Sequence, residues 1–460
     1  MSSIKPSIPK GTRDFSPDEM VKRNHIFDLI RKVFRLYGYL PLETPAMENL
    51  STLMGKYGEE GDKLLFKILN SGNYLDGFDH SVTNIQSPEC NIQDLTRHIS
   101  EKGLRYDLTV PFARYIVQHH HELAFPFKRY QIQPVWRADR PQKGRYREFF
   151  QCDVDVIGSN SLLYEIELVQ IIDDVFSNLG INIMVRLNNR KILAGIADTI
   201  GHPDKLTDLT IALDKIDKIG PEKVKAELAD RGISKTSVER IMPVIMAEGK
   251  MNERFSLLES FLHDSKPGMK GIEELHFITD YLQELNLRND FVFDMRLARG
   301  LNYYTGTIME VMAKDVSIGS LCGGGRYNDL TGIFGLPDMP GVGISFGADR
   351  IYDVMNELDL FPETIRSVTQ VLFINFGPEE SKYCFSILPV LRSYGIAVEI
   401  YPESAKIKKQ MDYANRKNIP FVVLIGQDEM ISGRLTIKRM KTGEQQQMTM
   451  DELIQIINNE

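Results

Sequence analysis

Two stretches of the chain, residues 128–137 and 149–156, alternate polar and apolar residues with a period of two. That period is the repeat of a β-strand, whose successive side chains point to opposite faces of the sheet. One side is polar in both stretches, with Arg129, Gln131, Gln133 and Arg137 in the first and Gln151, Asp153 and Asp155 in the second. The pattern predicts an antiparallel hairpin with one apolar face and one polar face.

The segment that joins the two predicted strands is strongly basic. Its cations are Arg140, Lys143, Arg145 and Arg147, which surround the turn formers Pro141 and Gly144. The chain as a whole is acidic, with 55 Lys and Arg against 63 Asp and Glu and a net charge of -8. A solvated basic turn is the common origin of a charge run taken alone. An anion-binding loop is the alternative, which the other motifs of the chain favour.

A helix is predicted to begin close to residue 17. Ser16, Pro17 and Glu19 supply an N-cap, a proline in the first turn and a capping-box glutamate. Apolar residues then follow at helical spacing as far as Gly38, after which residues 39–43 predict a strand. The apolar stripe of this helix faces either the core or a second subunit, and the pattern alone leaves both open.

The next part of the chain is less regular. Residues 70–103 have little periodicity and many turn formers, which predicts a long excursion from the core. Asp107 and Thr109 alternate with apolar neighbours and predict a short strand, and Pro111 is expected to open a helix.

The periodicities divide the 460 residues into about three domains, the number that this length favours. Residues 1–194 begin the largest domain, and 271–362, which return to strand-like and glycine-rich sequence, complete it. Residues 195–270 show helical segments with charged faces and predict a helical insertion. From 368 to 460, strand and helix signals alternate, which predicts a separate α/β domain.

Composition excludes several classes of protein. The four cysteines are far apart, without the paired spacing of a disulfide framework or a zinc site, and no metal site is expected. No apolar stretch is long enough for a bilayer, so we expect a cytoplasmic protein without membrane contact. The negative net charge disfavours nonspecific DNA binding and confines any nucleic-acid contact to local patches.

Three arginines in separate segments stand beside glycine-rich turns or strand ends: Arg137, Arg299 and Arg350. Guanidinium groups that form forked hydrogen bonds suit a reaction in which a carboxylate attacks the α-phosphorus of ATP and pyrophosphate leaves. Each arginine taken singly is equally explained by a surface ion pair. Their joint occurrence predicts ATP-dependent activation of a carboxylate.

Several motifs together resemble histidyl-tRNA synthetase, a family of class II aminoacyl-tRNA synthetases. They are PKGTRDF, VWRADRPQKGRYREFFQ, LARGLNYYTG, GGGRYNDL and GVGISFGADR, and the resemblance runs from about residue 9 to the C-terminus. It implies an α+β fold, with an antiparallel-sheet catalytic domain, a helical insertion and a C-terminal α/β anticodon-binding domain. It also implies activation of L-histidine with ATP and Mg²⁺, followed by transfer to tRNA(His), by a homodimer.

The resemblance also implies roles for the arginines. Arg137 would hold the α-phosphate of ATP, Arg145 would help to hold the nucleotide, and Arg350 would meet the γ-phosphate. Arg299 would stabilise the α-phosphate and the histidine carboxylate during activation, so Arg299 and Arg137 are the expected catalytic residues. A guanidinium keeps its charge at neutral pH, which suits these tasks.

For histidine itself, the resemblance implies that Asp107, Thr109 and Gln151 accept from the α-ammonium group. Asp155 and Tyr304 would pair the two imidazole nitrogens, with Tyr303 and Tyr327 lining the pocket and Arg299 at the carboxylate. Asp107 and Asp155 stand where many bacterial members carry glutamate. A site that pairs both ring nitrogens rejects isosteres, because a wrong ligand leaves buried polar groups unpaired.

Two regions are expected to contact tRNA. The loop that contains Arg140 and Lys143 is a candidate for the acceptor end, through phosphate and base-edge contacts. In the C-terminal domain a basic helix carries Lys406, Lys408, Lys409, Arg416 and Lys417, which a solvated helix face explains equally well.

Two other functions fit parts of the sequence. A regulatory relative that partners a phosphoribosyltransferase of histidine biosynthesis would share the fold, but such relatives typically lose the C-terminal domain and parts of the arginine motif. Residues 368–460 and Arg299 are both present here. A class II synthetase for another amino acid is the second alternative. The segment from Arg299 to Tyr304 and the lack of a zinc-ligand set disfavour it.

Overall fold

The computed structural model describes residues 5–54, 62–76, 92–142, 144–298, 304–362 and 369–459. The chain divides into two compact units. The first consists of Met1–Asp14 and Ile26–Leu360, and the second consists of Phe15–His25 and Phe361–Glu460.

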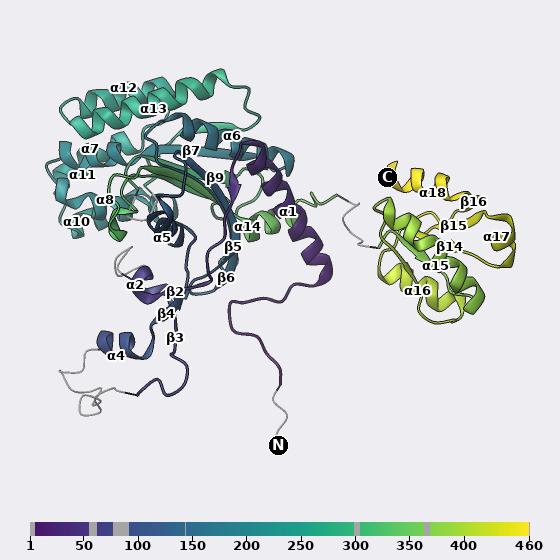
Figure 1. Ribbon diagram of the computed structural model, residues 1–460. Coiled ribbons are helices and arrows are strands. Elements are labelled where there is room, and N and C mark those ends of the chain that lie inside the picture. Colours follow the sequence, from purple (N-terminus) through teal and green to yellow (C-terminus); the bar gives the residue numbers. More distant parts are fainter. Residues whose placement is uncertain are drawn as a thin grey trace. The chain divides into compact units, whose positions relative to one another are not determined.

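The first unit is built on an eight-stranded sheet (Figure 1). The strand order is β1-β5-β6-β11-β10-β9-β7-β8, and all neighbours pair antiparallel except β1 with β5 and β7 with β8. The strands are β1 (Leu40–Pro41), β5 (Phe127–Trp136), β6 (Glu148–Ile157), β7 (Ile183–Asn189), β8 (Asp290–Phe293), β9 (Thr307–Ala313), β10 (Cys322–Tyr327) and β11 (Gly341–Gly347). The mainly antiparallel sheet expected from the resemblance is therefore confirmed.

The predicted hairpin is formed by β5 and β6. Arg129 pairs with Asp155, Gln131 with Asp153 and Gln133 with Gln151, so the polar residues of the two strands share one face. The intervening residues, such as Tyr130 and Val154, face the other side and are buried. The alternation in the sequence thus fixed both the pairing and the two faces of this hairpin.

Two helices cover the apolar face of the sheet, α1 (Pro17–Leu36) and α6 (Leu163–Asn178). The Phe34 ring of α1 lies 5.6 Å from that of Tyr130 on β5 and 5.8 Å from that of Phe346 on β11. The Phe176 ring of α6 lies 5.7 Å from Phe346. Aromatic contacts at these distances contribute beyond the area that they bury, so both helices are fixed on the sheet.

The predicted start of α1 is confirmed. The backbone N–H of Glu19 donates to Ser16 Oγ at 3.3 Å, and the Ser16 N–H donates to the Glu19 carboxylate at 2.7 Å, which is a complete capping box. The strand expected over 39–43 is shorter, and only Leu40–Pro41 pair with β5.

A small three-stranded sheet, β2-β4-β3, follows α1. Its elements and the helices near it are β2 (Met47–Asn49), α2 (Leu50–Leu53), β3 (Phe66–Ile68), α4 (Ile92–Ile99), β4 (Lys102–Leu104) and α5 (Thr109–His119). The strand predicted at Asp107 and Thr109 was wrong, because Thr109 is already the first residue of α5. The Asp107 carboxylate accepts from the Val110 N–H at 3.2 Å and ends the extended chain there.

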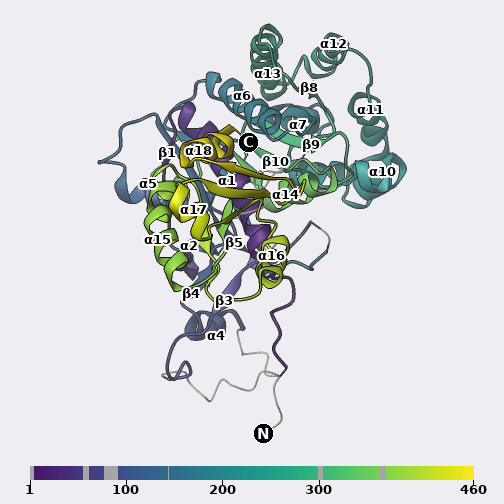
Figure 2. The same cartoon turned by 90° about the vertical axis from the view of Figure 1, so that its right-hand side faces the viewer.

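Every element between β7 and β8 is helical. These are α7 (Arg190–Thr199), η2 (Pro203–Lys205), α8 (Leu206–Leu213), α9 (Ile216–Ile219), α10 (Pro221–Asp230), α11 (Lys235–Ile245), α12 (Met251–Leu262) and α13 (Lys266–Glu284). Figures 1 and 2 show α10 to α13 as one group beside α7. Helices α7 and α13 approach closely, since a Cβ on Gly195 would lie 2.4 Å from the Gly268 Cα.

After β11 the chain forms α14 (Ala348–Glu357), and a 3-10 turn, η3 (Gly332–Phe334), precedes that strand. The second unit contains a five-stranded sheet of order β13-β12-β14-β15-β16. Its elements are β12 (Val371–Phe373), α15 (Pro378–Ser393), β13 (Val398–Ile400), α16 (Ile407–Arg416), β14 (Phe421–Leu424), α17 (Gln427–Ser432), β15 (Leu435–Arg439), β16 (Gln445–Met448) and α18 (Met450–Asn459). The predicted alternation of strands and helices is confirmed for β12 to β14.

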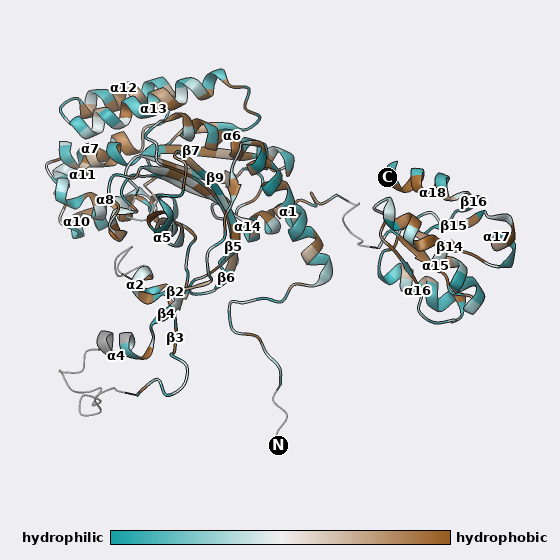
Figure 3. Ribbon diagram, in the orientation of Figure 1, coloured by the Kyte–Doolittle hydropathy of each residue, from teal (hydrophilic) through white to brown (hydrophobic). Residues whose placement is uncertain are grey.

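The distribution of apolar residues explains both units (Figure 3). In the first unit the brown strands β7 and β9 are enclosed by helices whose ribbons alternate between teal and brown. In the second unit the core is formed by residues such as Val371, Leu388 and Val423, all nearly inaccessible to solvent. Within the described residues no helix is both long and apolar enough to cross a membrane.

Glycine is required where β10 and β11 meet. A Cβ on Gly324 would lie 2.0 Å from the carbonyl oxygen of Gly343, which belongs to the backbone and has no freedom to turn away. We expect Gly324→Ala to lower the stability of the first unit by about 2 kcal/mol or more, the effect of overpacking a tight interior. Thermal unfolding followed by circular dichroism measures it.

The neighbouring Gly323→Ala is the matched control. Its Cβ would meet its closest atom, the Met309 carbonyl oxygen, at 3.5 Å, an ordinary contact distance. An unfolding temperature that falls equally in both variants would contradict the role given to Gly324.

Candidate active site

The candidate site is the polar face of the sheet where β5, β6, β11 and β10 lie side by side. Asp155 on β6 pairs with Arg129 on β5 and with Gly343 on β11, and Gly343 pairs with Gly325 on β10. The register therefore places one buried carboxylate between a guanidinium on one side and two glycines on the other. A side chain at either glycine would clash, since a Cβ on Gly343 would lie 1.9 Å from the Asp155 carboxylate and one on Gly325 2.4 Å from the Thr307 carbonyl oxygen.

Arg129 holds the charges of this face together. Its side chain is fully buried, and Nη2 lies 2.8 Å from Asp155 Oδ2 and 3.9 Å from Asp153 Oδ2. The guanidinium lies 4.2 Å from the ring centroid of Phe112 on α5, within the range of a cation–π contact. One buried cation thus faces two buried carboxylates.

Burial dominates the protonation of the two aspartates. It raises the pKa of Asp153 to about 7, against the opposing charge of Arg129 and with a further upward contribution from Asp155. The pKa of Asp155 is raised for the same reason, although Arg129 and the Tyr327 hydroxyl both oppose the rise. The Asp153 carboxyl therefore holds a proton up to about neutral pH.

Two tyrosines lie near Asp155: Tyr327 contacts it directly, and Tyr304 packs beside Tyr327. The Tyr327 hydroxyl donates to Asp155 Oδ1 at 2.8 Å, and burial raises the pKa of Tyr327 well above its usual value. Tyr304 packs in the same cluster as Tyr327 and Ala113, and its ring lies 3.1 Å from where a Cβ on Gly325 would be. Both positions predicted to contact an imidazole ring, Asp155 and Tyr304, thus adjoin Tyr327.

Further along β6, Gln151 offers an acceptor to the site. Its Nε2 donates to Ser345 Oγ at 2.8 Å, while its Oε1 is buried without a hydrogen-bond partner within the described residues. A buried acceptor without a partner is costly, and a ligand that donates to it would remove that cost. Asp107 and Thr109 stand at the start of α5, where Asp107 is buried and Thr109 half-buried.

Arg137 follows the last residue of β5. Its Nε donates to the Tyr106 carbonyl oxygen at 2.8 Å, next to Asp107, and its guanidinium lies 5.1 Å from the Phe149 ring centroid. Its backbone N–H donates to the Arg147 carbonyl at 2.8 Å. Arg137 is therefore fixed at the loop end of the hairpin, on the same face as Gln151.

Arg350, the third residue of α14, joins the hairpin tip to the loop before β10. Its Nε donates to the Gly144 carbonyl at 2.9 Å and its Nη1 to the Ser320 carbonyl at 2.7 Å. Arg145 forms a two-pronged ion pair with Asp139, at 2.8 and 2.9 Å, and is half exposed. Arg140 is exposed.

The N-terminal segment crosses the base of the same loop, a feature that the sequence did not reveal. Arg13 pairs with Asp349 of α14 and lies 3.3 Å from the Tyr146 ring centroid. The other carboxylate oxygen of Asp349 accepts from the Phe150 N–H at 3.0 Å, and the Gly11 carbonyl accepts from the Arg147 N–H at 2.8 Å. The segment from Gly11 to Arg13 thus connects α14 with the residues that lead into β6.

The structure brings together most of the predicted site. Tyr327 contacts Asp155, and Tyr304 packs beside Tyr327. Gln151 lies further along β6 and Arg137 directly after β5, while Asp107 and Thr109 stand at the start of α5. Arg350 contacts the tip that carries Arg145. Arg299, Tyr303 and Lys143, for which roles were also expected, lie outside the described residues.

Sequence reasoning missed Arg129, Asp153, Ser345 and Arg13 as parts of this site. The first two were already on the predicted polar face, and an unpaired charge in the middle of a strand was the signal that could have found them. Ser345 and Arg13 carried no such signal, because their partners, Gln151 and Asp349, lie 194 and 336 positions away.

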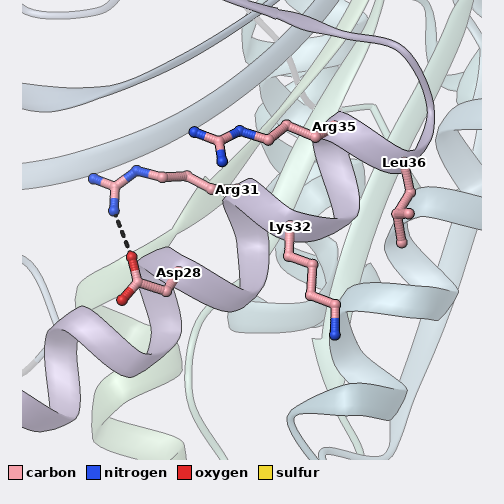
Figure 4. A pocket seen from close by; sticks show the side chains of 5 residues that line it. All are labelled: Asp28, Arg31, Lys32, Arg35 and Leu36. Carbon is pink, nitrogen blue, oxygen red and sulfur yellow. Dashed lines mark hydrogen bonds and ion pairs between the residues drawn. The ribbon is translucent and has the colours of Figure 1, made fainter. Parts of the chain in front are cut away.

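A separate hollow lies on the surface of α1 and is lined by that helix alone (Figure 4). Its residues are Asp28, Arg31, Lys32, Arg35 and Leu36, and Arg31 is paired with Asp28 at 2.8 Å. None of the predicted site residues lines it. Across the part of the chain that the structure describes, no group of three or more His, Cys, Asp or Glu side chains is arranged to hold a metal ion.

The chain is similar to known proteins over almost its whole length. A family model described as histidyl-tRNA synthetase matches residues 90–351, and one described as an anticodon binding domain matches 370–460. The histidine–tRNA ligase of Phocaeicola vulgatus is 58% identical over 455 residues, covering 99% of both chains. That of Porphyromonas gingivalis is 57% identical over 447 residues, covering 97% of this chain and 98% of the relative.

Solved structures show the same fold. The histidyl-tRNA synthetase of Nostoc sp. superimposes with a TM-score of 0.84 at 30% identity, covering 99% of this chain and all of that one. A Bacillus halodurans protein described as an ATP phosphoribosyltransferase regulatory subunit/histidyl-tRNA synthetase reaches 0.72 at 19% identity, over 92% of this chain and 99% of that one. The second likeness concerns the fold alone.

The raised pKa of Asp153 has a measurable consequence. Because the folded chain keeps a proton on Asp153 that the unfolded chain loses above its ordinary pKa of 3.8, the stability contributed by that proton declines as the pH rises toward about 7. In Asp153→Asn the side chain at position 153 is neutral at every pH. We expect the stability of Asp153→Asn relative to the unaltered protein to increase from about pH 5 to about pH 8, measured by urea unfolding. A constant difference across that range would contradict the protonation assigned to Asp153.

Proposed function

The chain belongs to the histidyl-tRNA synthetase family, and from that membership we propose how its residues carry out the charging of tRNA with histidine. The activity itself is ATP-dependent ligation of histidine to tRNA. In the first step the histidine carboxylate attacks the α-phosphorus of ATP and pyrophosphate leaves. In the second step the terminal ribose of tRNA takes the histidyl group from the adenylate.

We propose that the space bounded by Asp155, Tyr304 and Tyr327 binds the imidazole ring. The observation that supports this most directly is the fixed carboxylate of Asp155, held by Arg129 at 2.8 Å and by the Tyr327 hydroxyl at 2.8 Å. A carboxylate held in this way accepts from a ring N–H without moving. Tyr304 supplies the partner for the other nitrogen, and a site that pairs both nitrogens discriminates against rings with a different pattern of donors.

The α-ammonium group is proposed to donate to Asp107, Thr109 and Gln151. The free Oε1 of Gln151 and the buried carboxylate of Asp107 are suitable acceptors. Charge-assisted hydrogen bonds of this kind are about twice as strong as neutral ones. They fix the carboxylate of histidine at the end of the face where Arg137 lies.

The arginines are proposed to hold the triphosphate and to stabilise the charge of the transition state. Arg137 contacts the α-phosphate, Arg145 and Arg350 the more distal part of the nucleotide, and Arg299 the α-phosphate and the histidine carboxylate. The Nε of Arg137 is already engaged by the Tyr106 carbonyl, which orients the rest of the guanidinium. Oriented donors of this kind cost no reorganisation when the reaction occurs.

Magnesium is proposed to enter as part of the substrate, bound to the phosphates of ATP. The described residues offer no cluster of three or more acidic or imidazole side chains that would hold it alone. Oxygen ligands from phosphates complete the octahedral shell that Mg²⁺ prefers.

For tRNA, the basic loop with Arg140 and Lys143 is proposed to contact the acceptor end, and the second unit the anticodon. Lys406, Lys408, Lys409, Arg416 and Lys417 of the second unit are all exposed on or next to α16. We further propose a cytoplasmic homodimer whose domains are 1–194, 195–270, 271–362 and 368–460, the first and third together forming the catalytic domain.

Amino-acid specificity tests the proposal as a whole. We expect ATP–pyrophosphate exchange to depend on histidine and to stay near background with each of the other nineteen amino acids, because the imidazole space pairs both ring nitrogens. Exchange with a different amino acid would place the chain with another class II specificity. Exchange with none would favour the regulatory alternative.

The histidine pocket is tested by Tyr304→Phe. The change removes one hydroxyl and keeps the ring that packs against Gly325. We expect the KM for histidine to rise about 10- to 100-fold, the effect of leaving one polar group of the ligand unpaired, while the KM for ATP stays the same.

Tyr130→Phe is the matched control for this test. Tyr130 lies on β5 but faces the apolar side of the sheet, where its hydroxyl accepts from Arg35 Nε at 3.3 Å. The control should change neither KM. A rise in both KM values for Tyr304→Phe, or in neither, would contradict the role assigned to Tyr304.

A further inference from the structure

A turn near the N-terminus packs on the loop of the hairpin. The Thr12 N–H and the Thr12 hydroxyl both donate to the Pro9 carbonyl, at 3.1 and 2.7 Å. From the loop, the Arg147 N–H donates to the Gly11 carbonyl at 2.8 Å, and Arg147 Nη1 donates to the Lys10 carbonyl at 3.4 Å. The turn is therefore attached to the residues that lead into β6.

Glycine is required where this turn comes closest to the loop. Gly11 has a φ of +90°, a conformation that residues with a Cβ rarely adopt. A Cβ there would lie 2.9 Å from the side chains of both Arg147 and Pro141. Because the turn is closed by its own hydrogen bonds and its glycine touches the loop, the loop sets the direction in which the chain continues to Arg13.

Arg13 places its guanidinium between this loop and α14. It donates to one carboxylate oxygen of Asp349, the second residue of α14, and lies 3.3 Å from the Tyr146 ring centroid. The Asp349 side chain is 5% exposed, and its other oxygen accepts from the Phe150 N–H at 3.0 Å. One cation and its buried partner thus join the hairpin loop to the first turn of α14.

Arg350 is the next residue along α14, so its position follows that of Asp349. Its Nε donates to the Gly144 carbonyl at 2.9 Å and its Nη1 to the Ser320 carbonyl at 2.7 Å. A rotation of the first turn of α14 would move both donors away from their acceptors. The pair of Arg13 with Asp349 opposes that rotation, since it holds the turn through the residue that precedes Arg350.

Asp349 would remain partnered without Arg13. It would keep the Phe150 N–H as a donor and would still stand in the first turn of a helix, where the helix dipole favours a carboxylate. The Arg13 side chain is 23% exposed and is not enclosed in the core. What its removal takes away is the link from α14 to the N-terminal turn and to Tyr146, and with it the orientation of the first turn of α14.

We propose that Arg13 is a positioning residue for the nucleotide half of the site: through Asp349 it fixes the first turn of α14 and thereby the place where Arg350 meets the distal phosphates of ATP. The inference rests on the role proposed for Arg350. It makes the N-terminal turn a determinant of ATP binding that acts through α14.

Arg13→Gln tests the proposal, because it removes the charge and keeps a polar side chain. We expect the KM for ATP in histidine-dependent ATP–pyrophosphate exchange to rise about 5- to 10-fold and the KM for histidine to stay within about 2-fold, since a displaced phosphate-binding group weakens the hold on ATP alone. The unfolding temperature should fall by less than about 3 °C, because Asp349 stays partnered. A lysine can serve both the carboxylate and the ring, so Arg13→Lys should raise the KM for ATP by less than about 3-fold.

Arg31→Gln is the matched control. Arg31 also combines a carboxylate with a ring, since it pairs with Asp28 at 2.8 Å and lies 5.9 Å from the Phe27 ring centroid, all on α1. Its replacement should leave both KM values unchanged. An equal rise of the KM for ATP in Arg31→Gln and Arg13→Gln would overturn the proposal, because loss of positive charge alone would then explain it. An unaltered KM for ATP in Arg13→Gln, or an equal rise of both its KM values, would overturn it as well.

A double-mutant cycle with Arg350→Gln separates this inference from the role of Arg350. We expect Arg350→Gln to raise the KM for ATP about 10- to 100-fold, and Arg13→Gln to raise it by less than about 2-fold further in that background. If Arg350→Gln leaves the KM for ATP unchanged, the role proposed for Arg350 fails and the inference fails with it. If Arg350→Gln raises that KM and Arg13→Gln multiplies it by the same factor as in the unaltered protein, Arg350 keeps its role and the action of Arg13 through it is wrong.

Discussion

Asp153 and Asp155 are buried two residues apart on β6, and the fully buried guanidinium of Arg129 is the charge that makes this arrangement tolerable. A buried carboxylate without a counter-ion is driven to its neutral form. Because Arg129 and Tyr327 both engage Asp155, that residue keeps a fixed orientation at the floor of the proposed imidazole pocket. The recognition of a polar ring thus depends on an ion pair that the ligand itself does not touch.

Space is the second requirement, and the glycine-rich strands provide it. A Cβ on Gly343 would lie 1.9 Å from the Asp155 carboxylate, and one on Gly341 would lie 2.4 Å from the Tyr327 ring. The GVG motif therefore serves the pocket through the absence of side chains. Only glycine at these two positions leaves the Asp155 carboxylate of β6 and the Tyr327 ring of β10 where they are.

Contacts from distant segments then complete the environment of the nucleotide end. Arg13 reaches Asp349, the Asp349 carboxylate accepts from the Phe150 N–H, and Arg350 holds the Gly144 carbonyl. The hairpin tip is in this way attached to the N-terminal segment and to α14. A basic loop that would be a solvated turn in isolation is thus attached to the rest of the proposed site from its tip to the start of β6.

The sequence by itself determined the hairpin of β5 and β6, the polar and apolar faces of both strands, the capping box of α1 and the helical character of residues 195–270. These follow from local periodicity and capping, which act over a few residues. Motifs in the chain also indicated the family and therefore the residues to expect in the site. Only the tertiary structure decided that Thr109 opens a helix, that Arg129 faces both Asp153 and Asp155, and that Arg13 pairs with Asp349. The ion pairs of Arg129 and Arg13 join residues from 24 to 336 positions apart, and their geometry depends on strand order and helix packing, which no local pattern specifies.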